Sequence, residues 1–253
     1  MPKMKLLAWP LLIVLLSPLV SAEPLSVRYV QGGSIEPFSY RVNGVAKGVL
    51  PDIVSLVFSS LGVEAHTRLI PESRTLFEII NNRADATAVL VLRNITIEDY
   101  PEILTVCPNP LFVSKVYLIW HSDTQLIPGK IYDLDKYRVG IWNSGRGFLQ
   151  KAGVPTAERL KFQDAENMFK SVVSRRIDAA IMSWDHVEFL SKRLGVEGQV
   201  QKGQFVSDLY LHLAVTDSWL AEGGLVGQVC EKVSELKQAG EFHTIIDHYL
   251  GQK

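Results

Sequence analysis

Two short segments of this chain share one pattern, and each stands in the same setting. Arg83-Ala84-Asp85-Ala86 and Arg176-Ile177-Asp178-Ala179 both follow a helix-like stretch that contains a phenylalanine, and both lead into an apolar run. Self-similarity at long range indicates an architecture of repeated units. Arginine, aspartate and alanine are common enough for a chance match, but the matching flanks favour duplication. A duplicated α/β unit predicts two lobes, and two similar lobes form a cleft.

The N-terminus has the pattern of a secretory signal peptide. Two lysines precede an apolar run over residues 6–20, and Val20-Ser21-Ala22 supplies the small residues of a cleavage site. We predict cleavage after Ala22 and an exported mature protein. A membrane anchor is the alternative. Pro10 and Pro18 disfavour it, because they interrupt a run that is already short of the roughly 20 apolar residues that span a bilayer.

Charge and length exclude some classes of partner. Without Lys3 and Lys5, 24 of the 26 basic residues remain against 27 acidic ones, so residues 23–253 carry a formal charge of −3. This balance gives no electrostatic reason to expect a nucleic acid or an anionic membrane as partner. The length suits one large domain or two small ones, each with a real core.

The two cysteines, Cys107 and Cys230, are far apart in sequence. An oxidising compartment would permit a disulfide between them. Two buried free thiols are the interpretation that we favour here, and the disulfide stays open. In either case we expect both residues in the same lobe, because the C-terminal helices should return to the first lobe. We expect no metal site, since neither cysteine has another cysteine or a histidine at ligand spacing.

The periodicity predicts the same order of elements twice. In the first unit, strands are expected at residues 25–30, 66–70 and 86–92, with helices from Pro51 onward and over 74–83. In the second unit, strands are expected at 137–142, 159–162 and 177–182, with helices at 145–151, after an N-cap at Asp164, and at 184–194. Strands that alternate with helices predict βαβ units and parallel sheets.

Two further stretches connect these units. Residues 111–120 and 209–215 are predicted to be extended, and two extended crossings between two lobes form a hinge. The C-terminal segments 225–236 and 240–249 are predicted to be helices. We therefore expect the lobes to close by hinge bending at these crossings.

Several motifs resemble those of one protein family. Glu36-Pro37-Phe38-Ser39-Tyr40 resembles its first strand and loop, and Val139-Gly140-Ile141-Trp142-Asn143-Ser144-Gly145 resembles the start of its second lobe. The segment 235–242, followed by Tyr249-Leu250-Gly251, resembles its closing motif. The family is the amino-acid type of periplasmic solute-binding protein, family 3, which serves ABC importers. The likeness covers nearly all of residues 23–253.

The resemblance implies a fold, a location and partners. The fold would be the two-lobed type II fold of periplasmic binding proteins, two α/β lobes joined by a two-strand hinge. Lobe 1 would hold residues 23–111 and 210–253, and lobe 2 residues 112–209. The protein would be a periplasmic monomer that binds a small molecule and delivers it to an inner-membrane ABC permease. Nothing in the sequence implies a cofactor.

The chain departs from the family where the family holds its amino acid. An arginine usually follows the third strand, but none follows Thr96, and the nearest is Arg93. The aspartate that usually binds the amino group is replaced by Ser183, with Asp185 nearby. The position of the usual aromatic shelf is Glu72. Amino-acid binding therefore does not carry over directly.

In open α/β units, ligands bind outside the carboxyl ends of the parallel strands. This rule selects the loops 32–38, 71–74, 93–96, 143–147, 163–166 and 183–185. The candidate binding residues in or beside these loops are Glu36, Phe38, Glu72, Arg74, Arg93, Asn94, Thr96, Trp142, Asn143, Ser144, Gly145, Arg146, Ser183, Trp184 and Asp185.

Three of these candidates, Arg74, Arg93 and Arg146, are arginines. Guanidinium groups bind carboxylates through two parallel hydrogen bonds, and the helix start near Gly145 would add free backbone N–H groups. These features predict a solute with a carboxylate, an amino acid or a related compound. Surface ion pairs are the alternative role for the arginines.

The other candidates allow other chemistry. Trp142 and Trp184 could form an apolar or cation–π wall of the site, or pack inside the protein. Glu36, Glu72 and Asp185 could meet a cationic group. Besides a binding protein, two alternatives stay open: a ligand-sensing receptor subunit, and a dehydratase-like enzyme that would use Glu72 or Asp185 with a raised pKa.

Overall fold

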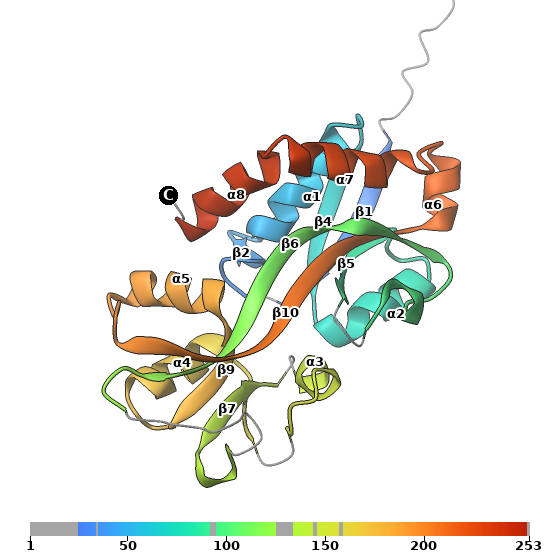
Figure 1. Cartoon of the computed structure of the whole chain (residues 1–253). Helices are drawn as coiled ribbons and strands as arrows, with labels where there is room; N and C mark the ends of the chain where they lie inside the picture. Colours follow the sequence, from blue (N-terminus) through green and yellow to red (C-terminus); the bar gives the residue numbers. More distant parts are fainter. Residues whose placement is uncertain are drawn as a thin grey trace, which may run out of the picture.

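The protein is described here by a computed structural model that covers residues 25–33, 35–91, 95–124, 134–143, 146–156 and 159–251. The signal-peptide prediction and the candidates Arg93, Asn94, Ser144 and Gly145 lie outside the described residues. Figure 1 shows two lobes joined by two long strands that run side by side between them. The two-lobed α/β fold expected from the sequence is confirmed.

Lobe 1 contains parallel strands with helices on both faces. Its strands are β1 (Ser26–Gly32), β4 (Glu64–Ile70) and β5 (Ala86–Val91). Its helices are α1 (Val49–Ser59), α2 (Thr75–Ile80), α6 (Asp217–Glu222), α7 (Gln228–Gln238) and α8 (Glu241–Leu250). A small hairpin of β2 (Tyr40–Val42) and β3 (Val45–Lys47) precedes α1. Within the described residues, no helix is long and apolar enough to span a membrane.

Lobe 2 repeats the plan on a smaller scale. Its strands are β7 (Val139–Trp142), β8 (Leu160–Phe162) and β9 (Ala179–Ser183). Its helices are α3 (Arg146–Lys151), α4 (Ala165–Val173) and α5 (Trp184–Leu194). The predicted cap of α4 is confirmed, because the Asp164 carboxylate accepts a hydrogen bond of 2.8 Å from the backbone N–H of Asn167.

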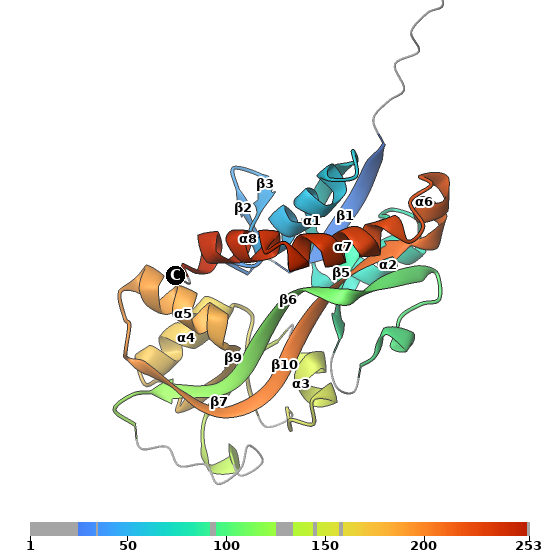
Figure 2. The same ribbon diagram turned by 45° about the horizontal axis from the view of Figure 1, so that its top comes forward.

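The two connecting strands are β6 (Leu104–His121) and β10 (Val200–Thr216). They pair with each other in antiparallel fashion, and they make one twisted sheet of the order β4-β1-β5-β10-β6-β9-β7-β8. β10 pairs with β5 of lobe 1, whereas β6 pairs with β9 of lobe 2. Both strands are longer than the predicted crossings, and Figure 2 shows them bending together from one lobe into the other.

Each lobe has an apolar core on either face of its strands. In β1, Tyr29 packs toward α1, α7 and α8, while the next residue, Val30, packs toward Ile79 of α2. In β9, Ile181 lies in the core beneath α3, whereas Met182 lies in the core beneath α4 and α5. Successive strand residues point to opposite faces, so the unbroken apolar runs of these strands follow from helices on both sides.

The repeated Arg-x-Asp-Ala segments occupy equivalent places in the two lobes. The carboxylate of Asp85 accepts hydrogen bonds from the backbone N–H of Arg28 at 2.8 Å and from its guanidinium at 2.8 and 2.5 Å. Asp178 does the same for Arg138, at 2.7, 3.3 and 2.9 Å. In both lobes the aspartate therefore fixes the start of the first strand against the start of the third.

Cys107 of β6 and Cys230 of α7 form a disulfide, so the preference for free thiols was wrong. The physical reason is the packing of α7 directly on β6, which brings the two sulfurs together. Cys107 is fully buried in the lobe 1 core, and Cys230 packs against the same core. Both cysteines thus belong to lobe 1, as expected.

Candidate functional site

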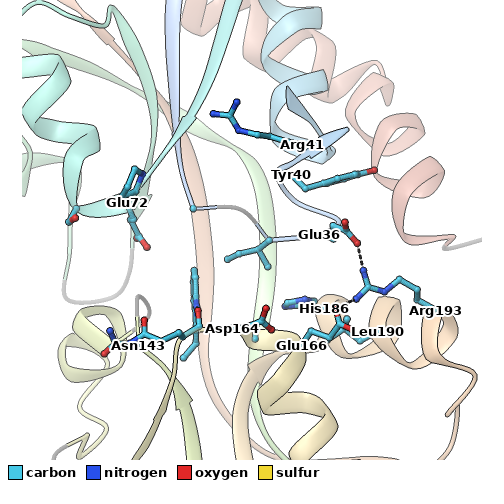
Figure 3. Close-up of a pocket in the computed structure, with 17 residues that line it drawn as sticks. Glu36, Tyr40, Arg41, Glu72, Asn143, Asp164, Glu166, His186, Leu190 and Arg193 are labelled. Carbon is cyan, nitrogen blue, oxygen red and sulfur yellow. Dashed lines mark hydrogen bonds and ion pairs between the residues drawn. The ribbon is translucent and has the colours of Figure 1, made fainter. Parts of the chain in front are cut away.

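A large cavity lies between the lobes at the carboxyl ends of the parallel strands. Its volume is about 830 Å³, and both lobes line it. Lobe 1 contributes the segments after β1 and β4, and lobe 2 contributes the segments after β7 and β8 and one face of α5. Figure 3 shows Glu72 and Arg41 on the lobe 1 side and Asn143 and Asp164 on the lobe 2 side. We call this space the outer cavity.

A smaller space, the inner cavity, continues from it toward β6 and β10. Its volume is about 190 Å³. The two cavities share the lining residues Ile35, Glu72, Trp142, Ala165 and His186. Most other walls of the inner cavity are apolar side chains, among them Phe38, Phe112, Val116, Met168, Ile181 and Leu211. The cleft is therefore polar at its mouth and apolar in its depth.

An ion-pair network crosses the mouth of the cleft. Arg193 of α5 pairs with Glu36 of lobe 1 and with Glu166 of its own lobe (Figure 3). Glu166 also pairs with Lys170 at 2.7 Å, and these cationic neighbours lower the pKa of its carboxyl. The Glu36–Arg193 pair joins the two lobes directly, so it stabilises the arrangement of the lobes seen here.

Replacing Arg193 with alanine should shift the protein toward an open cleft. The change removes the cation between Glu36 and Glu166. The Glu36 side chain is 39 % exposed. Because solvent screens the pair, its removal should cost only about 1 kcal/mol of the free energy that holds the lobes together. X-ray scattering of the ligand-free protein should then show a larger radius of gyration than that of the wild type.

Arg176→Ala is the matched control for this change, because Arg176 is exposed on lobe 2 and makes no ion pair among the described residues. Raising the salt concentration should weaken the Glu36–Arg193 pair in the wild type and move its radius in the same direction. A radius that is the same for Arg193→Ala and the wild type would contradict this role.

Glu72 lies at the junction of the two cavities, close against Gly32, where there is no room for a side chain at residue 32. A Cβ atom at Gly32 would lie 3.0 Å from both Cα and Cγ of Glu72. The Glu72 side chain is exposed to the cleft and lines both cavities, and partial desolvation there raises its pKa.

His186 is a buried titratable group of the cleft. Its side chain lines both cavities, its residue is 7 % exposed, and its ring contacts that of Phe38 across the lobes, with 5.9 Å between ring centres. Burial, together with the positive charge of the nearby Arg193, lowers the pKa of His186 to about 4. The imidazole is therefore neutral at pH 7, with one nitrogen that donates and one that accepts.

The depressed pKa of His186 predicts a pH dependence of stability. In the unfolded chain the imidazole titrates near its ordinary pKa of about 6.5, so between that pH and pH 4 the unfolded state binds the extra proton. The free energy of unfolding should fall as the pH drops through this window. His186→Gln should make the fall shallower, by about 1–2 kcal/mol between pH 7 and pH 5.

Urea unfolding at several pH values measures this difference. His243→Gln is the control, since His243 is exposed on α8. The expectation fails if His186→Gln and the wild type lose stability in parallel as the pH falls.

The structure brings together some of the predicted site residues and leaves others outside the cleft. The lining includes Glu36, Phe38, Glu72, Trp142, Asn143 and Ser183. Neither cavity is lined by Arg74, Thr96, Arg146, Trp184 or Asp185. Arg74 and Arg146 are exposed, so of the three arginines expected to hold a carboxylate, neither described one lines the cleft.

The residues outside the cleft have other contacts. Trp184 packs under the ammonium of Lys202, with 4.2 Å from Nζ to the ring centre, so its cation–π partner comes from β10. Asp185 accepts a hydrogen bond from Ser114 of β6. The backbone N–H of Thr96 donates to Asp99 at 2.7 Å, in the cap of a short 3₁₀ turn.

Several residues that line the outer cavity were not among those predicted from the sequence. Tyr40 and Arg41 belong to the hairpin β2–β3, whose signal was Asn43-Gly44, a dipeptide typical of tight hairpin turns. His186, Leu190 and Arg193 lie on one face of α5, at a spacing of one helical turn. The strand-end rule considers loops alone and therefore passes over a helix face.

Within the described ranges, no group of three histidine, cysteine, aspartate or glutamate side chains could hold a metal ion. The described lining offers hydrogen bonds, charges and apolar contact.

Comparisons with known proteins agree on the fold. No family model and no curated protein matches the chain. A histidine kinase sensor domain similar to periplasmic binding proteins is 13 % identical, with a TM-score of 0.69, and the match covers 89 % of this chain and 96 % of that one. The substrate-binding protein of an amino acid ABC transporter is 16 % identical, with a TM-score of 0.67, over 90 % of this chain and 100 % of that one.

A third solved structure is an ancestral amino acid-binding protein, a precursor of cyclohexadienyl dehydratase. It is 16 % identical, with a TM-score of 0.67, and the match covers 89 % of this chain and 95 % of that one. At such identities the likeness concerns the fold. The chain thus has the two-lobed fold shared by periplasmic-binding-protein-like domains, as the resemblance of its motifs predicted.

Proposed function

We propose that this protein is an exported solute-binding protein that closes its two lobes on a small polar solute in the periplasm. The cleft that both lobes line, with a cross-lobe ion pair at its mouth, is the observation that carries the proposal. Lobe 1 would consist of residues 23–111 and 210–253, and lobe 2 of residues 112–209. Delivery of the solute to an ABC permease by a monomeric protein is part of the proposal.

The lining supports binding rather than a packed interface. Ser39 and His186 line the cleft, and among the described residues no group bonds the Ser39 hydroxyl or the His186 ring nitrogens. These polar atoms are open to the cleft, where a bound solute would form hydrogen bonds with them. The fold of the amino acid ABC transporter protein fits this role.

A solute-library thermal-shift screen on the mature protein tests the proposal. We expect a few related solutes to raise the melting temperature, because a ligand that binds only the folded state stabilises it. X-ray scattering with a hit at saturation should show a smaller radius of gyration. If the hits leave the radius unchanged, or if no solute stabilises the protein, the closing-cleft function is wrong.

One observation favours an enzyme of the same fold as a second candidate. A dehydratase-like reaction would need a carboxyl with a raised pKa in the cleft, and Glu72 has this property. One neighbour in fold is a precursor of a dehydratase. Following each screened solute by NMR in the presence of the protein separates the two: conversion of the solute would indicate the enzyme, and an unchanged solute the binding protein.

A further inference from the structure

We propose that the cleft recognises an amphipathic organic cation, with a primary ammonium at Glu72 and an apolar chain in the inner cavity. This inference rests on the proposed binding function and names its ligand class. It departs from the carboxylate-bearing solute that the arginines of the sequence suggested. Two features carry it: the charges of the residues that line the outer cavity, and the apolar walls of the inner cavity.

The described acidic residues of the outer cavity differ in whether another protein group pairs with or hydrogen-bonds their carboxylates. Glu36 and Glu166 pair with Arg193, and Asp164 caps α4. Glu72 differs, because its carboxylate has no hydrogen bond or ion pair among the described residues. Glu72 is therefore the acid of the described lining whose charge no protein group balances, and it lies where the apolar inner cavity begins. A ligand ammonium beside Glu72 would pair with it.

The acids of the outer cavity outnumber its bases. Among the described lining residues, four are acidic, Glu36, Glu72, Asp164 and Glu166, and two are arginines, Arg41 and Arg193. Arg193 bridges two of the glutamates, and Arg41 donates to the backbone carbonyl of Leu69 at 2.8 Å. The charge of the described lining therefore favours a cationic ligand.

The inner cavity begins at Glu72 and is shaped for an apolar group. Phe38, Phe112 and Met168 are among its walls, and Trp142 stands at the junction. Burial of an apolar chain there is favourable at roughly 25 cal/mol per Å² of area removed from water. A ligand with its ammonium at Glu72 would direct its chain into this space.

The test uses four probes with the same six-carbon chain: hexylamine, hexanoate, hexanol and norleucine. Binding to the full mature protein is measured by calorimetry and by NMR saturation transfer. We expect hexylamine to bind more tightly than hexanol, and hexanoate to bind least. Glu72→Gln should weaken hexylamine binding about 10- to 100-fold, the range of a charge-assisted hydrogen bond, and should leave hexanol binding unchanged.

Glu222→Gln is the matched control, because Glu222 is exposed at the end of α6, a helix that Figure 1 shows at the end of lobe 1 away from lobe 2. Circular dichroism shows whether each variant is folded. Norleucine binding without hexylamine binding would overturn the ligand class while supporting the proposed function. Tighter binding of hexanoate, equal affinity of Glu72→Gln and the wild type for hexylamine, or no binding of any probe would also overturn the inference. The library screen decides the function itself.

Discussion

Replacing both Cys107 and Cys230 with alanine is expected to lower the free energy of unfolding by about 2–5 kcal/mol. The disulfide joins residues separated by 123 positions in the chain. A cross-link that closes so long a loop removes many conformations from the unfolded state, and the stabilisation grows with the logarithm of loop length. Because α7 is tied to β6 within lobe 1, the loss should appear in the unfolding of that lobe.

Urea unfolding of the double variant and the wild type, followed by tryptophan fluorescence and circular dichroism, measures the difference. The alanines also remove two sulfur atoms from the core, where Cys107 is fully buried. Reduced wild-type protein separates the effects, since it keeps the sulfurs and loses only the cross-link. The cross-link contributes nothing if oxidised and reduced wild type unfold at the same urea concentration.

The sequence could predict the fold because its signals are local and repeated. The order of elements, the N-cap at Asp164 and the two crossings each depend on patterns within about ten residues. The length of β6 and β10 could not be read in this way. Their length depends on pairing in the assembled sheet. The two strands pair with each other, and in addition β10 pairs with β5 of lobe 1 and β6 pairs with β9 of lobe 2.

The candidate site could be predicted by position but less well by chemistry. Loops at the ends of β1, β4, β7, β8 and β9 all contribute lining residues, as the strand-end rule implies. Which side chains turn into the cleft depends on tertiary packing. Trp184 and Asp185 begin α5, but Trp184 contacts β10 and Asp185 contacts β6. The next residue, His186, lines both cavities.

The sequence also left the cysteine pair open for a physical reason. A disulfide needs its two Cα atoms within about 7 Å, and Cys107 and Cys230 lie on elements whose contact is set by the return of the C-terminal helices to lobe 1. The Cα–Cα distance in the fold is 4.9 Å. The separation of the two cysteines along the chain does not predict this distance.

Replacing Asp85 with alanine should destabilise the protein by about 1–3 kcal/mol, the cost of leaving buried hydrogen-bonding groups without partners. The Asp85 side chain is 10 % exposed and holds the backbone N–H and the guanidinium of Arg28. The Arg28 side chain is 51 % exposed, so water can take over its guanidinium. The backbone N–H at the start of β1 accounts for most of the expected loss.

Asp178→Ala is the natural comparison, because Asp178 makes the same contacts with Arg138 in lobe 2. Its side chain is 31 % exposed, so water can replace more of its hydrogen bonds and the loss should be smaller. Urea unfolding of the two variants and the wild type ranks the losses. If neither substitution costs more than that of an exposed aspartate, these hydrogen bonds do not stabilise the lobes. A larger loss of unfolding free energy for Asp85→Ala than for Asp178→Ala, with both above that of an exposed aspartate, would show that the same hydrogen bonds stabilise both lobes, and more strongly where they are more buried.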